Sequence, residues 1–144
     1  MFAVDTNVLL YAADRDAEQH TVCRRSLEEW RNQPSPWFLT WSICYEFIRV
    51  STHPRVFQRP WTAGAARDFL DAIMVSPGLT ILTPTDRHSA VLRKTLEELP
   101  DLRGNVIHDL HTAVLMREHG VSRIVTRDND FHRFPFLTVV DPLR

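Results

Sequence analysis

The chain has 144 residues, of which 44% are hydrophobic and 24% are charged. This length suits one domain with its own core, and the composition is ordinary for a globular protein. The net charge of −1 neither indicates nor excludes a nucleic-acid binder, because the field in a groove depends on where charges lie. No apolar stretch approaches the roughly 18 residues of a membrane span, and no signal-peptide pattern opens the chain. We therefore expect one domain over residues 1–144, located in the cytoplasm and not in a membrane.

The first half of the chain alternates short apolar runs with helical patterns. The expected elements are a strand at Phe2–Asp5, helices at Thr6–Ala13 and Ala17–Asn32, a strand at Trp37–Thr40 and a helix at Ser42–Thr52. Val22, Leu27 and Trp30 are the expected buried residues of the second helix. The only two cysteines, Cys23 and Cys44, fall in helical sequence without metal-ligand spacing. We expect them to be buried and not joined in a disulfide.

The second half continues the same alternation. The expected elements are helices at Thr62–Val75, Asp86–Leu99 and Asn105–His119 and strands at Thr80–Leu82, Arg123–Thr126 and Leu137–Val140. Thr62 and Asp86 are the expected N-caps of their helices, and Gly120 is a suitable residue to end the last one. Short apolar strands separated by helices predict a three-layer α/β/α fold with a central, mostly parallel sheet of about five strands.

Acidic residues follow two of the expected strands. Asp5 ends the first, and Asp128 comes just after the fourth, in Thr126-Arg127-Asp128. Because ligands collect beyond the carboxyl ends of parallel strands, both acids are expected at one edge of the sheet. Asp5 also has a simpler interpretation, as the N-cap of the following helix, and Asp128 lies in a polar loop where Asp is common.

Two further acids share apolar helix faces. Glu46 is three residues after Ile43, and Asp109 is three residues after Val106. Asn105 lies one turn before Asp109 and could hydrogen-bond its carboxylate. Taken alone, each acid could be a residue at the margin of an apolar stripe that reaches water. The hypothesis of a shared site depends on the conjunction of all four acids.

Charge repulsion constrains such a site. Two carboxylates about 5 Å apart repel by roughly 3 kcal/mol at an effective dielectric near 20. Three or four of them require either raised pKa values or a bound divalent cation. Oxygen ligands without nearby cysteine favour Mg²⁺ or Mn²⁺ over zinc. His108 and His111 are not spaced with Asp109 as a metal-binding pair, so we expect them at the surface or the core margin. His132 follows the acidic loop and could approach the site, but we assign it no role.

The sequence resembles PIN-domain ribonucleases, specifically the VapC toxins of bacterial toxin–antitoxin pairs. The matching segments extend over nearly the whole chain: Val4–Ala12, Glu46–Arg49, Asn105–Asp109 and Thr126–Phe131. The resemblance implies an α/β/α fold with a Mg²⁺-dependent acidic pocket formed by Asp5, Glu46, Asp109 and Asp128. Asp5 and Asp109 are the implied direct ligands, and the other two acids could act through water. His111 departs from the family pattern, in which small or apolar residues are common at this position.

The resemblance also assigns supporting residues and partners. Thr6, Asn7 and Thr126 match polar family positions, whereas Asp130 is either a second ligand or a brace for its loop. Family members are usually homodimers that a cognate antitoxin inhibits. The implied function is hydrolysis of RNA by metal-activated water, with Glu46 or Asp128 orienting the water and one or two ions taking part.

Arg49 and Arg127 could hold the RNA backbone, or could be solvated surface charges. A receiver domain is excluded because Lys94, the only lysine, lies within an expected helix. A haloacid-dehalogenase phosphatase is excluded because Asn7 stands where its second acid is needed. The remaining alternative is a PIN-fold protein that binds RNA or a partner without cutting.

Overall fold

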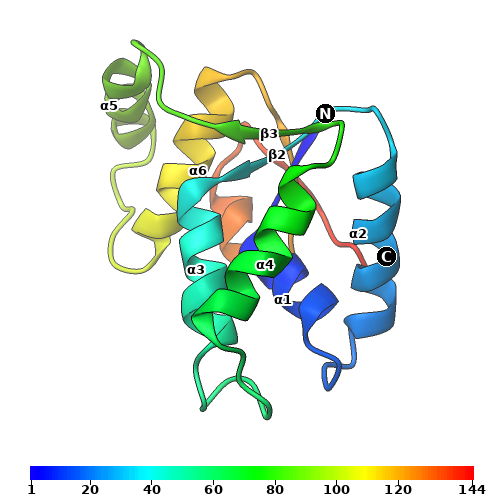
Figure 1. Ribbon diagram of the computed structural model, residues 1–144. Coiled ribbons are helices and arrows are strands. Elements are labelled where there is room, and N and C mark those ends of the chain that lie inside the picture. Colours follow the sequence, from blue (N-terminus) through cyan, green and yellow to red (C-terminus); the bar gives the residue numbers. More distant parts are fainter.

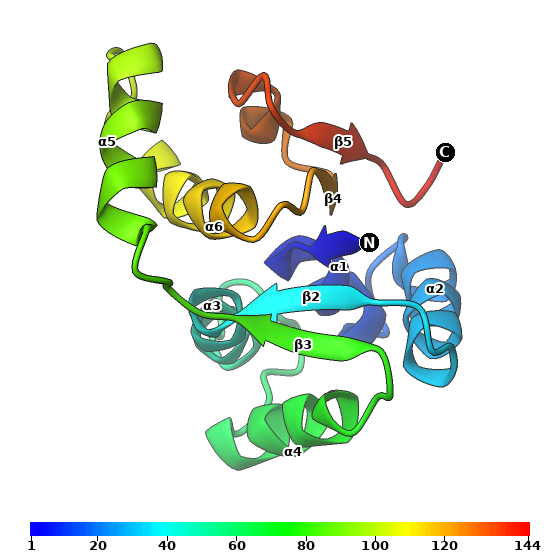
Figure 2. The ribbon, with the colours of Figure 1, turned by 90° about the horizontal axis from the view of Figure 1, so that it is seen from above.

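The centre of the molecule is a five-stranded sheet in which every neighbouring pair of strands is parallel. In this computed structural model, which describes all 144 residues, the strand order is β3-β2-β1-β4-β5 (Figure 2). The strands are β1 (Phe2–Val4), β2 (Trp37–Thr40), β3 (Leu79–Leu82), β4 (Arg123–Val125) and β5 (Thr138–Val140). The predicted α/β/α fold with about five short strands is confirmed. The carboxyl ends of all five strands lie at one edge of the sheet.

Helices cover both faces of this sheet. They are α1 (Thr6–Ala13), α2 (His20–Asn32), α3 (Trp41–Ser51), α4 (Ala63–Met74), α5 (His88–Glu98) and α6 (Val106–Glu118), with a short 3₁₀ helix η1 (Asn129–Arg133). Residues of α1 to α4 form one apolar cluster with the sheet, and residues of α6 and η1 form the other. Figure 1 shows α5 at the outside of the molecule, where it packs on α6.

The two apolar clusters arise from the two-residue period of the strands. Val4 and Val125 contribute to the cluster beneath α1 to α4, whereas their neighbours Ala3 and Ile124 contribute to the opposite one. All four residues are buried. Strands buried on both faces must be continuously apolar, which is why the first charged residue of the chain, Asp5, coincides with the end of β1.

Most helix and strand ends agree with the sequence prediction to within one or two residues. Thr62 caps α4, since its hydroxyl accepts a hydrogen bond from the backbone N–H of Ala65 at 3.1 Å. Gly120 follows α6 with φ +72°, a left-handed conformation that suits glycine. Cys23 and Cys44 are buried free thiols, as predicted. None of the helices has the length and apolar composition that crossing a membrane requires.

Three local predictions are wrong. Helix α2 begins at His20 rather than Ala17, because residues 14–19 form turns before it. Val22 is exposed, and Cys23 is the buried residue of that turn. Asp86 does not cap α5, which starts at His88 without any side-chain cap. Thr85 holds the segment before this helix: its backbone N–H donates to the carboxylate of Glu118 on α6, and its hydroxyl accepts from the backbone N–H of Arg87.

Candidate active site

Asp5 is the most buried acid at the carboxyl edge of the sheet. It follows β1 directly and is only 7% exposed. Its Oδ1 accepts a hydrogen bond from the backbone N–H of Thr6 at 2.8 Å, so Asp5 does cap α1. Its Oδ2 accepts from the Thr126 hydroxyl at 2.7 Å and from the Asn7 amide at 3.1 Å. One carboxylate therefore both caps a helix and faces the polar residues of the sheet edge, so the two interpretations of Asp5 are compatible.

Thr126 connects the two central strands at this edge. Besides donating to Asp5, its hydroxyl oxygen accepts from the Asn7 amide at 3.1 Å and from the backbone N–H of Asp128 at 2.9 Å. The Asn7 carbonyl oxygen in turn accepts from the backbone N–H of Arg127 at 3.3 Å. Thr126 is 1% exposed, so water does not compete strongly for these bonds. The loop after β4 is thus fixed to the start of α1.

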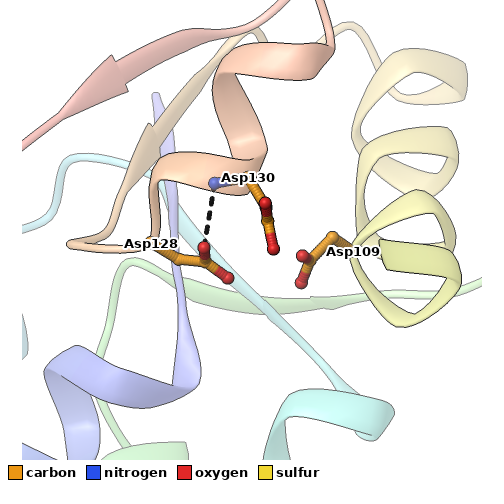
Figure 3. A group of neighbouring side chains, drawn as sticks. All are labelled: Asp109, Asp128 and Asp130. Atoms are coloured by element: carbon orange, nitrogen blue, oxygen red, sulfur yellow. Dashed lines mark hydrogen bonds between the residues drawn. The ribbon is translucent and has the colours of Figure 1, made fainter. Parts of the chain in front are cut away.

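Three carboxylates meet where this loop approaches α6. Asp128 caps η1 by accepting from the backbone N–H of Asp130 at 2.9 Å. Asp109 lies in the first turn of α6. One carboxylate oxygen from each of these three acids lies within 4.8 Å of the others, and Figure 3 shows the side chains converging. Asp130 therefore braces its loop through its backbone and also directs its carboxylate at Asp109.

Glu46 enters from α3, on the other side of Asp5. Its Oε2 accepts a hydrogen bond from the Thr6 hydroxyl at 3.0 Å, and its Oε1 lies 3.8 Å from Arg49 Nη2. The side chain is 47% exposed, so it stands at the margin of the apolar stripe, with Ile43 and Phe47 buried beneath it. A cleft of about 460 Å³ separates α3 from α6 and is lined by Asp5, Ser42, Ile43, Tyr45, Glu46, Arg49, His108, Asp109 and Thr112.

Burial and neighbouring negative charge raise the pKa values of two acids at this site, Asp5 and Asp109. Burial raises the pKa of Asp5 to about 6 against the effect of its hydrogen bonds, and the charges of Glu46 and Asp128 add to this rise. For Asp109, burial and then the charges of the surrounding acids, Asp128 first, raise the pKa to about 8. Asp109 has no cationic side chain as an ion-pair partner. This cluster of oxygen donors with uncompensated negative charge is suited to a hard divalent cation such as Mg²⁺ or Mn²⁺.

Two residues predicted to act near the acids do not join the cluster, namely Asn105 as a supporting residue and Arg127 as a contact for the RNA backbone. Asn105 is exposed at the start of α6, and its side chain makes no hydrogen bond to Asp109. Arg127 Nε lies 3.4 Å from Asp141 Oδ1, so its guanidinium group forms an ion pair just beyond the end of β5 and not with the acids of the cluster. His132 lines a separate hollow on that side together with Arg127. Arg49, in contrast, lines the cleft itself.

Sequence reasoning missed several residues that line the cleft. Ser42 stands four residues before Glu46, and Thr112 three residues after Asp109, so helical spacing from each acid would have found them. His108 is exposed, as expected for a surface histidine, and also lines the cleft. His111 is also exposed, and its Nδ1 lies 3.2 Å from the hydroxyl oxygen of Ser42. Tyr45 carried no signal of its own beyond its position beside Glu46.

Comparison with known proteins agrees with this geometry. Residues 2–137 match the model of the PIN domain family. Ribonuclease VapC43 of Mycobacterium tuberculosis is 35% identical over 143 residues, covering 99% of this chain and 96% of that protein. Ribonuclease VapC48 of the same organism is 27% identical over 138 residues, covering 96% of this chain and 94% of that protein.

Solved structures share the fold at lower identity. VapBC2 of Rickettsia felis, bound to a fragment of its promoter DNA, aligns with a TM-score of 0.65 at 20% identity, over 96% of both chains. VapC20 of Mycobacterium tuberculosis, a toxin that cleaves the sarcin–ricin loop, aligns with a TM-score of 0.61 at 19% identity, over 92% of this chain and 93% of that one. The family match and the full-length relatives together show that the chain belongs to the PIN-domain family and, within it, to the VapC ribonucleases.

Proposed function

We propose that this chain is a Mg²⁺-dependent endoribonuclease and the toxin of a VapBC-type pair, acting as a single nuclease domain in the cytoplasm. The observation that carries the proposal is the convergence of five carboxylates at the sheet edge without an equal number of cations. VapC ribonucleases related over the full chain length support RNA as the substrate. A cluster that raises the pKa of Asp109 to about 8 is poorly suited to a purely structural role, because it opposes folding unless a cation binds.

The acids have distinct expected roles toward the cation. Asp5 and Asp109 are the proposed direct ligands, Asp130 is a further candidate, and Glu46 and Asp128 act through water. When bound, Mg²⁺ (or Mn²⁺) lowers the pKa of a bound water and neutralises charge on the phosphate under attack. Asp5 is held for this role by Thr126 and Asn7, which fix the orientation of its Oδ2.

Side chains along α3 complete the proposed chemistry. The Thr6 hydroxyl holds Oε2 of Glu46, which leaves Oε1 on the cleft side to orient the attacking water and receive its proton. Arg49 is 69% exposed beside Glu46 and can contact a phosphate of the RNA backbone. Arg127 is a weaker candidate for this role, because its ion pair with Asp141 would first have to open.

The proposed partners follow from the solved relatives. Structures of VapBC proteins from Rickettsia felis and Salmonella typhimurium, both bound to DNA, share this fold. By analogy we propose a cognate antitoxin that inhibits this chain. We also propose a homodimer as the active form, which rests on the family resemblance alone. Growth arrest on expression should be relieved by co-expression of the product of an adjacent small gene. Absence of both toxicity and such a gene would instead favour the non-catalytic binding protein.

RNA cleavage by purified protein tests the function directly. Wild type should cut a mixed RNA pool with Mg²⁺ and stop when EDTA is added. Asp5→Asn should abolish cleavage while circular dichroism stays unchanged, because it removes a ligand charge without altering side-chain volume. Asp68→Asn on the exposed face of α4 is the matched control and should cut like wild type. Full cleavage by the Asp5→Asn protein would contradict the proposed role of Asp5 in metal-dependent cleavage.

A further inference from the structure

The exposed aromatic residues of this protein are concentrated beside the acidic cleft. Trp41 is 54% exposed and Tyr45 is 71% exposed. Every other Phe, Trp and Tyr of the chain is buried or half-buried. Aromatic side chains gain more from burial than most residues, so two exposed ones on a single helix call for a contact that covers them.

The two rings belong to one face of α3. Trp41, Tyr45 and Arg49 are spaced four residues apart, which places their side chains in a row along the helix. Tyr45 and Arg49 line the cleft together with Glu46, and Trp41 extends the row by one turn toward the start of α3. The row thus begins at the acids and continues outside them.

The surroundings of this row favour a nucleic acid over a protein partner. Apart from the buried Ile43, the residues that line the cleft together with Tyr45 are polar or charged, among them Ser42, Arg49 and His108, so a broad apolar patch does not surround this ring. Aromatic rings beside a cation are the arrangement on which unpaired nucleobases stack while the cation contacts the backbone. A base in a duplex is already stacked on its neighbours and cannot use such a platform.

We propose that Trp41 and Tyr45 form a stacking platform for unpaired bases next to the cleaved phosphodiester, and so select single-stranded RNA. The proposal rests on the nuclease function proposed above. Both residues lie outside the acid cluster, so they contribute to binding and positioning of the RNA and not to metal binding. Arg49 contacts the backbone between the platform and the acids.

Binding in EDTA separates this proposal from catalysis. The probe is a fluorescein-labelled 12-nucleotide single-stranded RNA of mixed sequence, compared with the same RNA in a duplex. Wild type should bind the single strand at least tenfold more tightly than the duplex. Trp41→Ala and Tyr45→Ala should each weaken single-strand binding about tenfold, within the range that stacking contributes per base. Val75→Ala, an exposed apolar residue after α4, is the control and should bind like wild type.

Shape-matched variants identify stacking as the cause. Tyr45→Phe keeps the ring and should keep the affinity, whereas Tyr45→Leu keeps apolar volume without the ring and should lose it. Single-stranded RNA should quench the fluorescence of Trp41, a change that Trp41→Phe abolishes. In cleavage assays with Mg²⁺, the alanine variants should raise KM and leave kcat within about twofold.

Several results would overturn the platform. Equal affinity for single strand and duplex would do so, as would a Tyr45→Leu variant that binds like wild type. Alanine variants that change the oligomeric state or antitoxin affinity but leave RNA binding intact would assign this face to a protein contact. If wild type binds RNA through these residues yet never cuts it, the nuclease proposal fails, and Trp41 and Tyr45 remain an RNA-binding surface without a role in cleavage. If wild type cuts and the alanine variants cut with unchanged KM, the platform alone fails.

Discussion

Asp109→Asn should stabilise the metal-free protein, although it removes a proposed ligand. Burial raises the pKa of Asp109, and the charges of the neighbouring acids, Asp128 first, add to this rise. A carboxyl whose pKa is raised on folding holds its proton more tightly in the folded state than in the unfolded state. The stability of the metal-free protein must therefore fall as pH rises from about 4 to about 8. Asparagine has nearly the same shape and no charge, so this loss should disappear.

The size of the effect follows from the shift. A rise of the pKa of Asp109 from 3.8 to about 8 corresponds to an upper limit of about 6 kcal/mol above pH 8. Because nearly half of the carboxyl group remains open to solvent, screening reduces this to about 1–2 kcal/mol. For a chain of this length, that stabilisation raises the Tm by about 4–8 °C. At pH 5 the folded protein keeps the proton, and the gain should shrink to a few tenths of a kcal/mol, roughly a quarter of the full effect.

Thermal unfolding in EDTA at pH 5 and pH 8, followed by circular dichroism, measures this difference. Wild type should lose stability between the two values, and Asp109→Asn should lose clearly less. Asp68→Asn, an exposed acid on α4, serves as the control and should follow wild type at both values. Adding Mg²⁺ at pH 8 should then raise the Tm of wild type and have little effect on Asp109→Asn. A variant that is less stable than wild type in EDTA at pH 8 would refute the electrostatic reasoning.

Three further substitutions test other parts of the structure. Thr126→Val removes the hydroxyl that holds the sheet-edge acids and should lower Mg²⁺ affinity about 10–100-fold in a titration, whereas Thr126→Ser should retain it. Gly78→Ala places a Cβ 2.2 Å from a backbone carbonyl oxygen and should cost about 1–3 kcal/mol in urea unfolding. Gly64→Ala within α4, where a Cβ would meet only the Thr62 hydroxyl at an ordinary contact distance of 3.9 Å, should stabilise by up to about 1 kcal/mol. Glu118→Gln weakens the bond of a fully buried carboxylate to His88 and should cost about 2 kcal/mol in the same assay; a neutral result would show that this pair is dispensable.

The elements that local sequence determines were predictable. The apolar strands β1 and β4, the Thr62 cap and the glycine after α6 all depend on residues within one turn of each other. The start of α5 was predicted less well, because the segment before it makes a hydrogen bond from Thr85 to Glu118, 33 residues away in the chain. A local cap residue such as Asp86 carries no information about such a contact.

In the candidate site too, some positions could be predicted from local sequence and others depend on long-range contacts. Strand ends were enough to place Asp5 and Asp128 at one edge of the sheet, because parallel strands share that edge. Helical spacing left Glu46 and Asp109 as candidates only, and the family resemblance is what assigned them to the same pocket. The ion pair of Arg127 could not be predicted from strand ends or helical spacing. Its partner Asp141 follows β5, and only the observed sheet order, which places β5 next to β4, brings the two together.

The acids of the cleft differ in how firmly the fold holds them. Asp5 and Asp128 are tied to each other through Thr126, across the two central strands, so their positions do not depend on a bound cation. Asp109 reaches the cluster from the opposite layer, on the first turn of α6, and no hydrogen bond holds its carboxylate there. Its nearest carboxylate oxygens on Asp128 and Asp130 lie within 4.8 Å, and two unit charges that close repel by at least about 3 kcal/mol at an effective dielectric near 20. We therefore expect repulsion among the acids to act mainly on the start of α6, and a proton on Asp109 or a bound cation to relieve it.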